Sequence, residues 1–179
     1  MNTSPEMQRY HDEEWGVAVR DDTRLFEKIS LEGFQAGLSW ATILAKRPRF
    51  REVFHGFDIP RVAAMDDGDV MRLLEDKGII RHRGKIEAVI NNAARTLEVQ
   101  REFGSLAEYV WQYEVDVSQR PREITREYLC EHTTCPESVA LSKDLRKRGF
   151  KFVGPTTMYA FMQSCGLVND HVTECSVHA

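Results

Sequence analysis

Residues 85–104, KIEAVINNAARTLEVQREFG, carry the most regular hydrophobic pattern in the chain. Their apolar side chains recur three and four residues apart, which places them on one face of an α-helix. A second amphipathic stretch, DDGDVMRLLED, begins with Asp66 or Asp67 as an N-terminal cap. Only DKGIIRHRGK, residues 76–85, joins the two stretches. The chain is therefore expected to contain two helices linked by a short turn with glycines.

The remaining sequence also has helical rather than strand-like patterns. One helix stops or bends at Gly37, and Pro48 and Pro60 punctuate two further short helices. Residues 114–136 lack clear periodicity and are expected to form the longest connection. Alternating polar and apolar runs that would indicate strands are missing. These patterns predict an all-α protein with a single domain over residues 1–179.

Composition restricts the class of protein. The chain has 179 residues, of which 42% are hydrophobic and 29% charged, as in a globular protein with one well-buried core. No apolar run approaches the roughly 18 residues of a membrane span, and MNTSPEMQRYHDEEWG contains no signal-like segment. We therefore expect a cytoplasmic protein with no membrane partner and with reduced cysteines. The net charge of −4 argues against indiscriminate coating of nucleic acid, but local basic patches are present.

The turn between the two paired helices is rich in glycines and cations. A helix N-terminus offers backbone N–H groups and a positive dipole to a phosphate, so this turn could grip a DNA backbone without reading its sequence. The simpler alternative is an ordinary helical hairpin with a solvated basic turn. The candidate helix-hairpin-helix element spans about residues 67–103. Its candidate DNA-binding residues are Gly78, Arg81, His82, Arg83, Gly84 and Lys85.

One carboxylate occupies a position where a helix should be apolar. In LFEKISLEGFQAGLSW, residues 25–40, a helical wheel places Glu32 among Leu25, Ile29 and Ala36. Such a buried acid is either satisfied by donors inside a helical core or faces a ligand in a pocket. Both interpretations stay open on the pattern alone.

Four segments in register resemble a known family. YHDEEWGV, LFEKISLEGFQAGLSWATIL, GIIRHRGKIEAVINNA and LSKDLRKRGFKFVGPTTMYAFMQSCGLVNDHV are similar to the Tag-type branch of the helix-hairpin-helix DNA glycosylases, the DNA-3-methyladenine glycosylase I family. The similarity runs over about residues 10–175. It implies two helical lobes with a base pocket between them, and N- and C-terminal ends packed together in one lobe.

The resemblance also implies an activity. A member of this family is a base-excision repair hydrolase that flips 3-methyladenine out of alkylated double-stranded DNA and hydrolyses its N-glycosidic bond without cutting the strand. Free 3-methyladenine would be the product, and a monomer is expected. The sequence does not indicate whether 3-methylguanine is also excised or which residue fills the gap in the DNA.

By this resemblance, Glu32 is the catalytic and base-recognition residue and meets the edge of the extruded base. Tyr10 and Trp40 match the stacking walls of the pocket. Methylation at N3 makes adenine cationic, so a buried carboxylate and aromatic faces favour the damaged base over the normal one. Trp15 could line the mouth of the pocket, or it could be a packing anchor.

Two alternative functions remain open. A cationic base departs as a neutral one, so no strong general acid is needed to protonate it. In agreement, VQREFG contains no aspartate at the place where similar glycosylases that attack neutral bases carry one. Lys85 follows the hairpin where a bifunctional glycosylase/lyase would place its Schiff-base amine, although it sits among other cations. The same helices could also form a catalytically silent DNA-binding or damage-sensing module.

A structural zinc ion is the remaining expectation. His171 and Cys175 in HVTEC are four residues apart, and His11 matches a third ligand of the family's site, which ties the two chain ends together. The family's N-terminal cysteine ligand has no counterpart in the ten residues before His11. Either His178 takes the fourth position, or the site is degenerate and packing alone holds the ends. We expect zinc, with His11, His171, Cys175 and His178 as candidate ligands.

Overall fold

The structure, a computed structural model, describes residues 4–175. Within these residues it contains ten α-helices, three short 3-10 turns and no strand, which confirms the predicted all-α class. No helix in this part is long and apolar enough to cross a membrane. The helices are α1 (Pro5–Glu13), α2 (Asp22–Gln35), α3 (Trp40–Val53), α4 (Ile59–Ala63), α5 (Asp67–Glu75), α6 (Arg83–Phe103), α7 (Leu106–Val110), α8 (Arg126–Glu131), α9 (Pro136–Lys147) and α10 (Pro155–Cys165).

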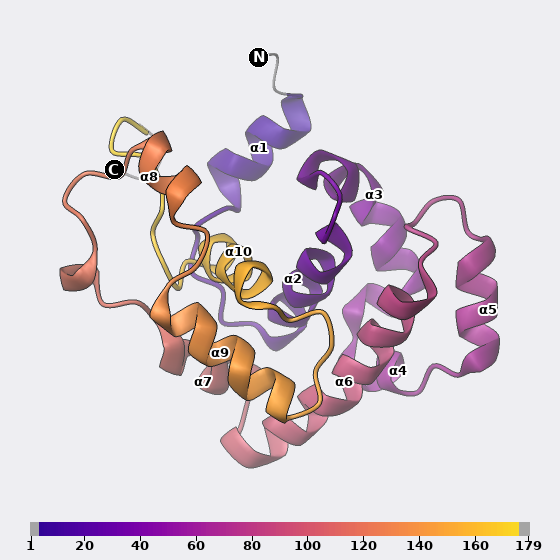
Figure 1. Cartoon of the computed structure of the whole chain (residues 1–179). Helices are drawn as coiled ribbons and strands as arrows, with labels where there is room; N and C mark the ends of the chain where they lie inside the picture. The colour runs from indigo at the N-terminus through magenta and orange to yellow at the C-terminus, as the bar shows by residue number, and fades with distance from the viewer. Residues whose placement is uncertain (1–3, 176–179) are drawn as a thin grey trace.

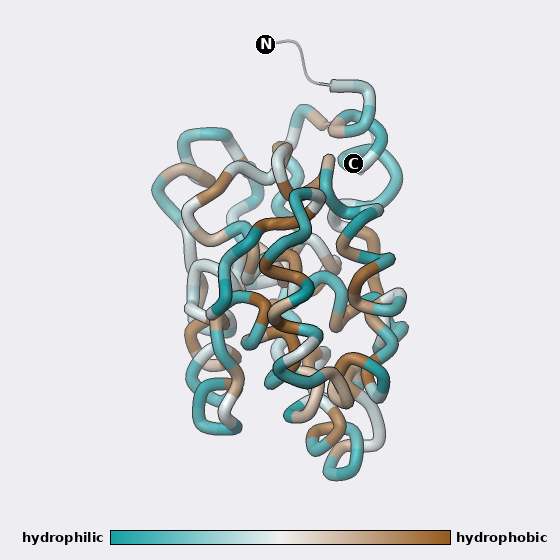
Figure 2. The backbone as a smooth tube through the Cα atoms, turned by 90° about the vertical axis from the view of Figure 1, so that its right-hand side faces the viewer, coloured by the Kyte–Doolittle hydropathy of each residue, from teal (hydrophilic) through white to brown (hydrophobic). Residues whose placement is uncertain are grey.

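Helix α2 occupies the centre of the molecule. It packs against α3 and α6 on one side and against α7 and α10 on the other, so it separates two helical lobes (Figure 1). The ten residues from Leu25 to Phe34 are all buried. Hydrophobic segments gather along the helices, whereas many connecting loops are hydrophilic (Figure 2). A polar residue on α2 is therefore placed at the junction of the two lobes.

Side-chain caps fix several helix ends. Asp66 caps α5 through a capping box with Asp69, as the sequence indicates. The carboxylate of Asp22 accepts hydrogen bonds of 2.9 Å from the backbone N–H groups of Leu106 and Ala107, which ties the start of α2 to the start of α7. Pro48, expected to separate two short helices, instead lies inside α3. The helix continues through it because the buried side chains on both sides of the proline hold it in place.

The segment expected to be a long connection packs along the C-terminal end of the described chain. Residues 114–136 contain a 3-10 turn (Val117–Gln119) and α8. The backbone N–H of Ile124 donates to Oγ1 of Thr173, and the backbone N–H of Thr173 donates to the carbonyl oxygen of Ile124, both at 2.9 Å. These contacts hold the last described residues beside α8.

Candidate active site

Helix α2 brings one carboxyl group into the interior. Glu32 is only 6% exposed, and no described residue lies within hydrogen-bonding distance of its Oε2. Burial raises the pKa of Glu32 to about 8, and the ammonium group of Lys28 lowers it only in part. An unpartnered buried acceptor costs about 1–3 kcal/mol of stability. The oxygen is therefore available to a donor from a molecule in the adjoining cavity.

Two aromatic side chains from other helices stand beside this carboxyl group. Tyr10 comes from α1, and Trp40 is the first residue of α3. Their ring centroids are 5.2 Å apart, and the planes are tilted by 44°, so the rings contact each other and form one corner of a cavity. The cavity has a volume of about 230 Å³. It is lined by Tyr10, Trp15, Glu32, Gln35, Trp40, Ala160 and Gln163.

A network of charged side chains surrounds the ring of Tyr10. Glu14 accepts two hydrogen bonds of 2.7 and 2.8 Å from Arg47, whose guanidinium lies 5.7 Å from the centre of the Tyr10 ring. On another side, Nζ of Lys28 lies 5.4 Å from that ring and donates to the carbonyl oxygen of Ser164 at 3.0 Å. Burial raises the pKa of the Tyr10 hydroxyl above its ordinary value, so the group stays neutral at physiological pH.

Trp15 fits both interpretations that the sequence left open. It lines the cavity, and its ring also packs edge-on against the ring of His171, at a centroid distance of 4.6 Å. The side chain is therefore a wall of the cavity that is itself fixed by packing.

The chemistry of the cavity suits a flat, electron-poor ring. It is smaller than the roughly 300–1,000 Å³ of sites for drug-sized ligands, so it matches a single heterocycle better than a whole nucleotide. Aromatic faces attract a cationic ring, and the free oxygen of Glu32 accepts a hydrogen bond from it. The cavity can thus bind a planar cation that carries an N–H donor.

Comparison with known proteins agrees with this geometry. The family model described as methyladenine glycosylase matches residues 1–178. The chain belongs to the methyladenine glycosylase family. DNA-3-methyladenine glycosylase 1 of Escherichia coli strain K12 is 53% identical over 167 residues, which cover 93% of this chain and 88% of the relative.

Solved structures show the same fold. A crystal structure of 3-methyladenine DNA glycosylase I has a TM-score of 0.91 at 50% identity and covers 99% of this chain and 97% of that one. A variant of 3-methyladenine DNA glycosylase I in complex with 3-methyladenine has a TM-score of 0.88 at 35% identity. This match covers 98% of this chain and 94% of that one.

The hairpin of this family member is built as the sequence predicts. Helices α5 and α6 are joined by residues 76–82, and the ring Nδ1 of His82 accepts from the backbone N–H of Lys85 and so caps α6. A side chain at Gly78 would meet Cγ of Arg49 at 2.6 Å, so the close approach requires glycine there. Gly84, the second residue of α6, lies beside the His82 ring, and Arg81, His82 and Arg83 are exposed where the turn meets the helix.

The side chain of Lys85 contacts the C-terminal end of α2. The residue is 7% exposed, and its Nζ donates to the carbonyl oxygens of Phe34 and Ala36 at 2.8 and 2.6 Å. The ammonium group thus satisfies the last carbonyl groups of α2 and points away from the exposed turn. In this structure the side chain is held by α2, and its part in the phosphate grip stays a prediction.

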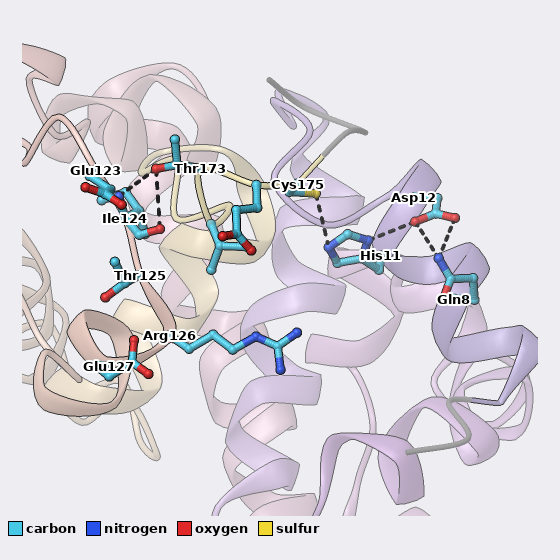
Figure 3. Close-up of a pocket in the computed structure, with 12 residues that line it drawn as sticks. Gln8, His11, Asp12, Glu123, Ile124, Thr125, Arg126, Glu127, Thr173 and Cys175 are labelled. Atoms are coloured by element: carbon cyan, nitrogen blue, oxygen red, sulfur yellow. Dashed lines mark hydrogen bonds and ion pairs between the residues drawn. The ribbon is translucent and has the colours of Figure 1, made fainter.

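Two of the predicted metal ligands, His11 and Cys175, lie near the junction of α1 and the C-terminal segment (Figure 3). His11 Nε2 is 3.9 Å from Sγ of Cys175, and its Nδ1 is 2.8 Å from the carboxylate of Asp12. The rings of His11 and His171 are 5.5 Å apart, and the Nδ1 atom of His171 lies 2.9 Å from the side-chain oxygen of Asn169. Within residues 4–175, no three such side chains converge tightly enough to hold a metal ion. His178 lies outside the described residues.

Sequence reasoning missed three residues of the cavity wall. Gln35, Ala160 and Gln163 line it together with the predicted aromatic residues. All three lie in segments that carry the family resemblance, and within those segments their signal is helical spacing: Gln35 follows Glu32 by three residues on α2, and Gln163 follows Ala160 by three residues on α10. A pattern of that kind is typical of any helix face, so it could not single them out.

Proposed function

We propose that this protein removes 3-methyladenine from alkylated double-stranded DNA by hydrolysing the N-glycosidic bond. The observation that carries the proposal is the unpartnered Oε2 of Glu32 in a cavity walled by Tyr10 and Trp40. A flipped cationic base would offer this oxygen the donor that it lacks, whereas a normal neutral adenine offers a weaker one. The relatives, which are named for this base, support the same substrate.

The chemistry needs little from the protein beyond this pocket. The methylated base leaves as a neutral molecule, so the pocket has to bind the cationic base, keep it out of the stack and leave the sugar carbon open to water. Glu32 contributes to recognition, because its carboxylate favours the cationic methylated base over a neutral one. A direct test is the release of free 3-methyladenine from methylated duplex DNA, measured by chromatography. Tight binding of that DNA without any base release would instead favour the silent damage-sensing module.

The bifunctional alternative has less support. A Schiff base would require Lys85 Nζ to leave the two carbonyl groups of α2 and to reach the sugar. Those carbonyl groups accept hydrogen bonds from the protonated amine, which opposes its use as a nucleophile. Base release without strand cleavage and without a borohydride-trapped adduct is the result expected of a monofunctional enzyme.

We further propose that the protein acts as a monomer in the cytoplasm and that a zinc ion ties α1 to the C-terminal segment. Zinc ligands at about 2.0–2.3 Å in a tetrahedron lie roughly 3.5 Å apart, so the 3.9 Å between His11 and Cys175 is close to that of a ligand pair. The contact of Asp12 with the other nitrogen of His11 is the kind of support that zinc-bound histidines usually have. His171 and His178 would complete the set, and the ion would contribute stability rather than chemistry.

A further inference from the structure

Gln163 forms part of the cavity wall that no sequence motif pointed to. It lies on the last turn of α10 and lines the same cavity as the α2 residue Glu32. Its Nε2 is 2.7 Å from Oδ2 of Asp170. The amide therefore connects the cavity to a buried carboxylate behind it.

The environment of Asp170 determines how this amide is oriented. Asp170 is 1% exposed and forms an ion pair with Arg120. The hydroxyl of Tyr159 donates to its Oδ2 at 2.5 Å. Oδ2 of Asp170 accepts from the Tyr159 hydroxyl, and the amide atom of Gln163 that faces it is the NH₂ group. The amide oxygen, Oε1 of Gln163, is thereby turned the other way.

We propose that Oε1 of Gln163 is a base-recognition group that accepts a hydrogen bond from the exocyclic amine of the flipped base. This proposal rests on the proposed function and deepens it. Among the described residues, no donor is bound to this oxygen, and Gln163 lines the same cavity as Glu32. The exocyclic amine of adenine carries two hydrogens, so one can pair with Glu32 and the other with Gln163.

The fixed orientation makes the site selective for an amine. A base with an oxygen at position 6 would place an acceptor against Oε1, and neither atom has a hydrogen to share. A freely rotating glutamine could turn its NH₂ group towards such a base. Here, that rotation would place Oε1 against the carboxylate of Asp170, which would leave two acceptors in contact inside the protein. The Asp170 contact thus converts an adaptable amide into a fixed acceptor.

The test compares two free bases that differ only at position 6. Binding of 3-methyladenine and of 3-methylhypoxanthine is measured by quenching of tryptophan fluorescence, since Trp15 and Trp40 line the cavity. The wild-type protein should prefer 3-methyladenine. In Gln163→Met, which keeps the length of the side chain but has no amide, the preference should fall by about threefold or more, the effect of losing one hydrogen bond between neutral groups.

A matched control separates recognition from general destabilisation. Tyr159→Phe removes another hydrogen bond from the same Asp170 oxygen without altering a residue of the cavity wall, and it should leave the preference unchanged. An unchanged preference in Gln163→Met overturns the proposal, as does an equal loss in Tyr159→Phe. A wild-type protein that binds the free base but releases none from methylated DNA contradicts the glycosylase activity and not the role of Gln163. Failure of the wild-type protein to bind either base overturns both.

Discussion

Nζ of Lys85 donates a hydrogen bond of 2.8 Å to the carbonyl oxygen of Phe34. The residue that follows the basic turn thus binds the C-terminal end of α2, two residues beyond Glu32. The start of α6 and the end of α2 are held to each other by this contact. A lysine that looks like part of a cationic cluster in the sequence is a structural link between the two proposed sites.

Replacing Lys85 by Met should destabilise the fold. Met keeps the apolar stem but leaves the carbonyl groups of Phe34 and Ala36 without their donor, which should lower the free energy of unfolding by about 1–3 kcal/mol. Urea denaturation measures the change. Lys77→Met, at an exposed position of the same turn, is the control and should change stability by less than about 0.5 kcal/mol. Equal stability of the two variants would contradict the structural role of Lys85.

The raised pKa of Glu32 predicts a pH dependence of excision. The carboxyl group of the free enzyme is largely protonated below its pKa of about 8, and only its ionised form attracts the cationic base. The kcat/KM for 3-methyladenine excision should therefore rise with pH up to about 8 and then level off. Glu32→Gln should remove this rise and lower the plateau by about tenfold or more, since a charge-assisted contact is worth about 1.5–3 kcal/mol. Wild-type kinetics in Glu32→Gln would show that the charge plays no part.

The same group should make the fold less stable as pH rises. Its pKa is raised from 4.5 in the unfolded reference to about 8 in the folded protein, so only the folded state retains the proton between these values. The free energy of unfolding should fall as pH increases through this window. Glu32→Gln lacks the effect and should gain stability relative to the wild type, by an amount on the order of a few kcal/mol at pH 8 and near zero at pH 4. The melting temperatures of both proteins, measured across this pH range, provide the test. If they change in parallel with pH, Glu32 does not cause the loss of stability.

Because Lys85 is buried, the exposed residues Arg81 and Arg83 are the cations with which DNA binding by the turn can be tested. Replacing Arg81 and Arg83 by Ala should weaken binding to any duplex and should reduce the slope of log affinity against log salt by about two, since each lost phosphate contact contributes roughly 0.9. Arg101→Ala, at the far end of α6, is the control for the loss of a positive charge. If the salt slope of the double variant matches that of this control, the turn does not contact DNA.

The sequence was most informative where local rules dominate. Helix α6 and the Asp66 cap follow from periodicity and cap chemistry, and the buried position of Glu32 follows from its helical wheel. Pro48 shows the opposite case, because its local preference to end a helix is overridden by packing around α3. A single local pattern cannot report such tertiary contacts.

The composition of the cavity could not be predicted from local sequence patterns. Tyr10, Glu32 and Trp40 come from three helices, and only the resemblance to a family brought them together before the structure did. The proposed role of Gln163 depends on its contact with Asp170, which is paired with Arg120, 50 residues earlier in the chain. Tertiary packing creates that dependence, and no spacing in the sequence encodes it.

Chelation should test the metal proposal through stability. A zinc ion held by His11 and Cys175 would join residues that are 164 positions apart, so its removal should lower the melting temperature by several degrees, given about 2–4 °C per kcal/mol for a protein of this size. Excision at low temperature should remain nearly intact, because neither residue lines the cavity that holds Glu32. Cys175→Ser should reproduce the loss of stability and of bound zinc, whereas Cys130→Ser, at an exposed cysteine, should keep both. Elemental analysis that finds no zinc in protein purified without chelator, together with no melting shift on adding zinc, would show that packing alone holds the chain ends together.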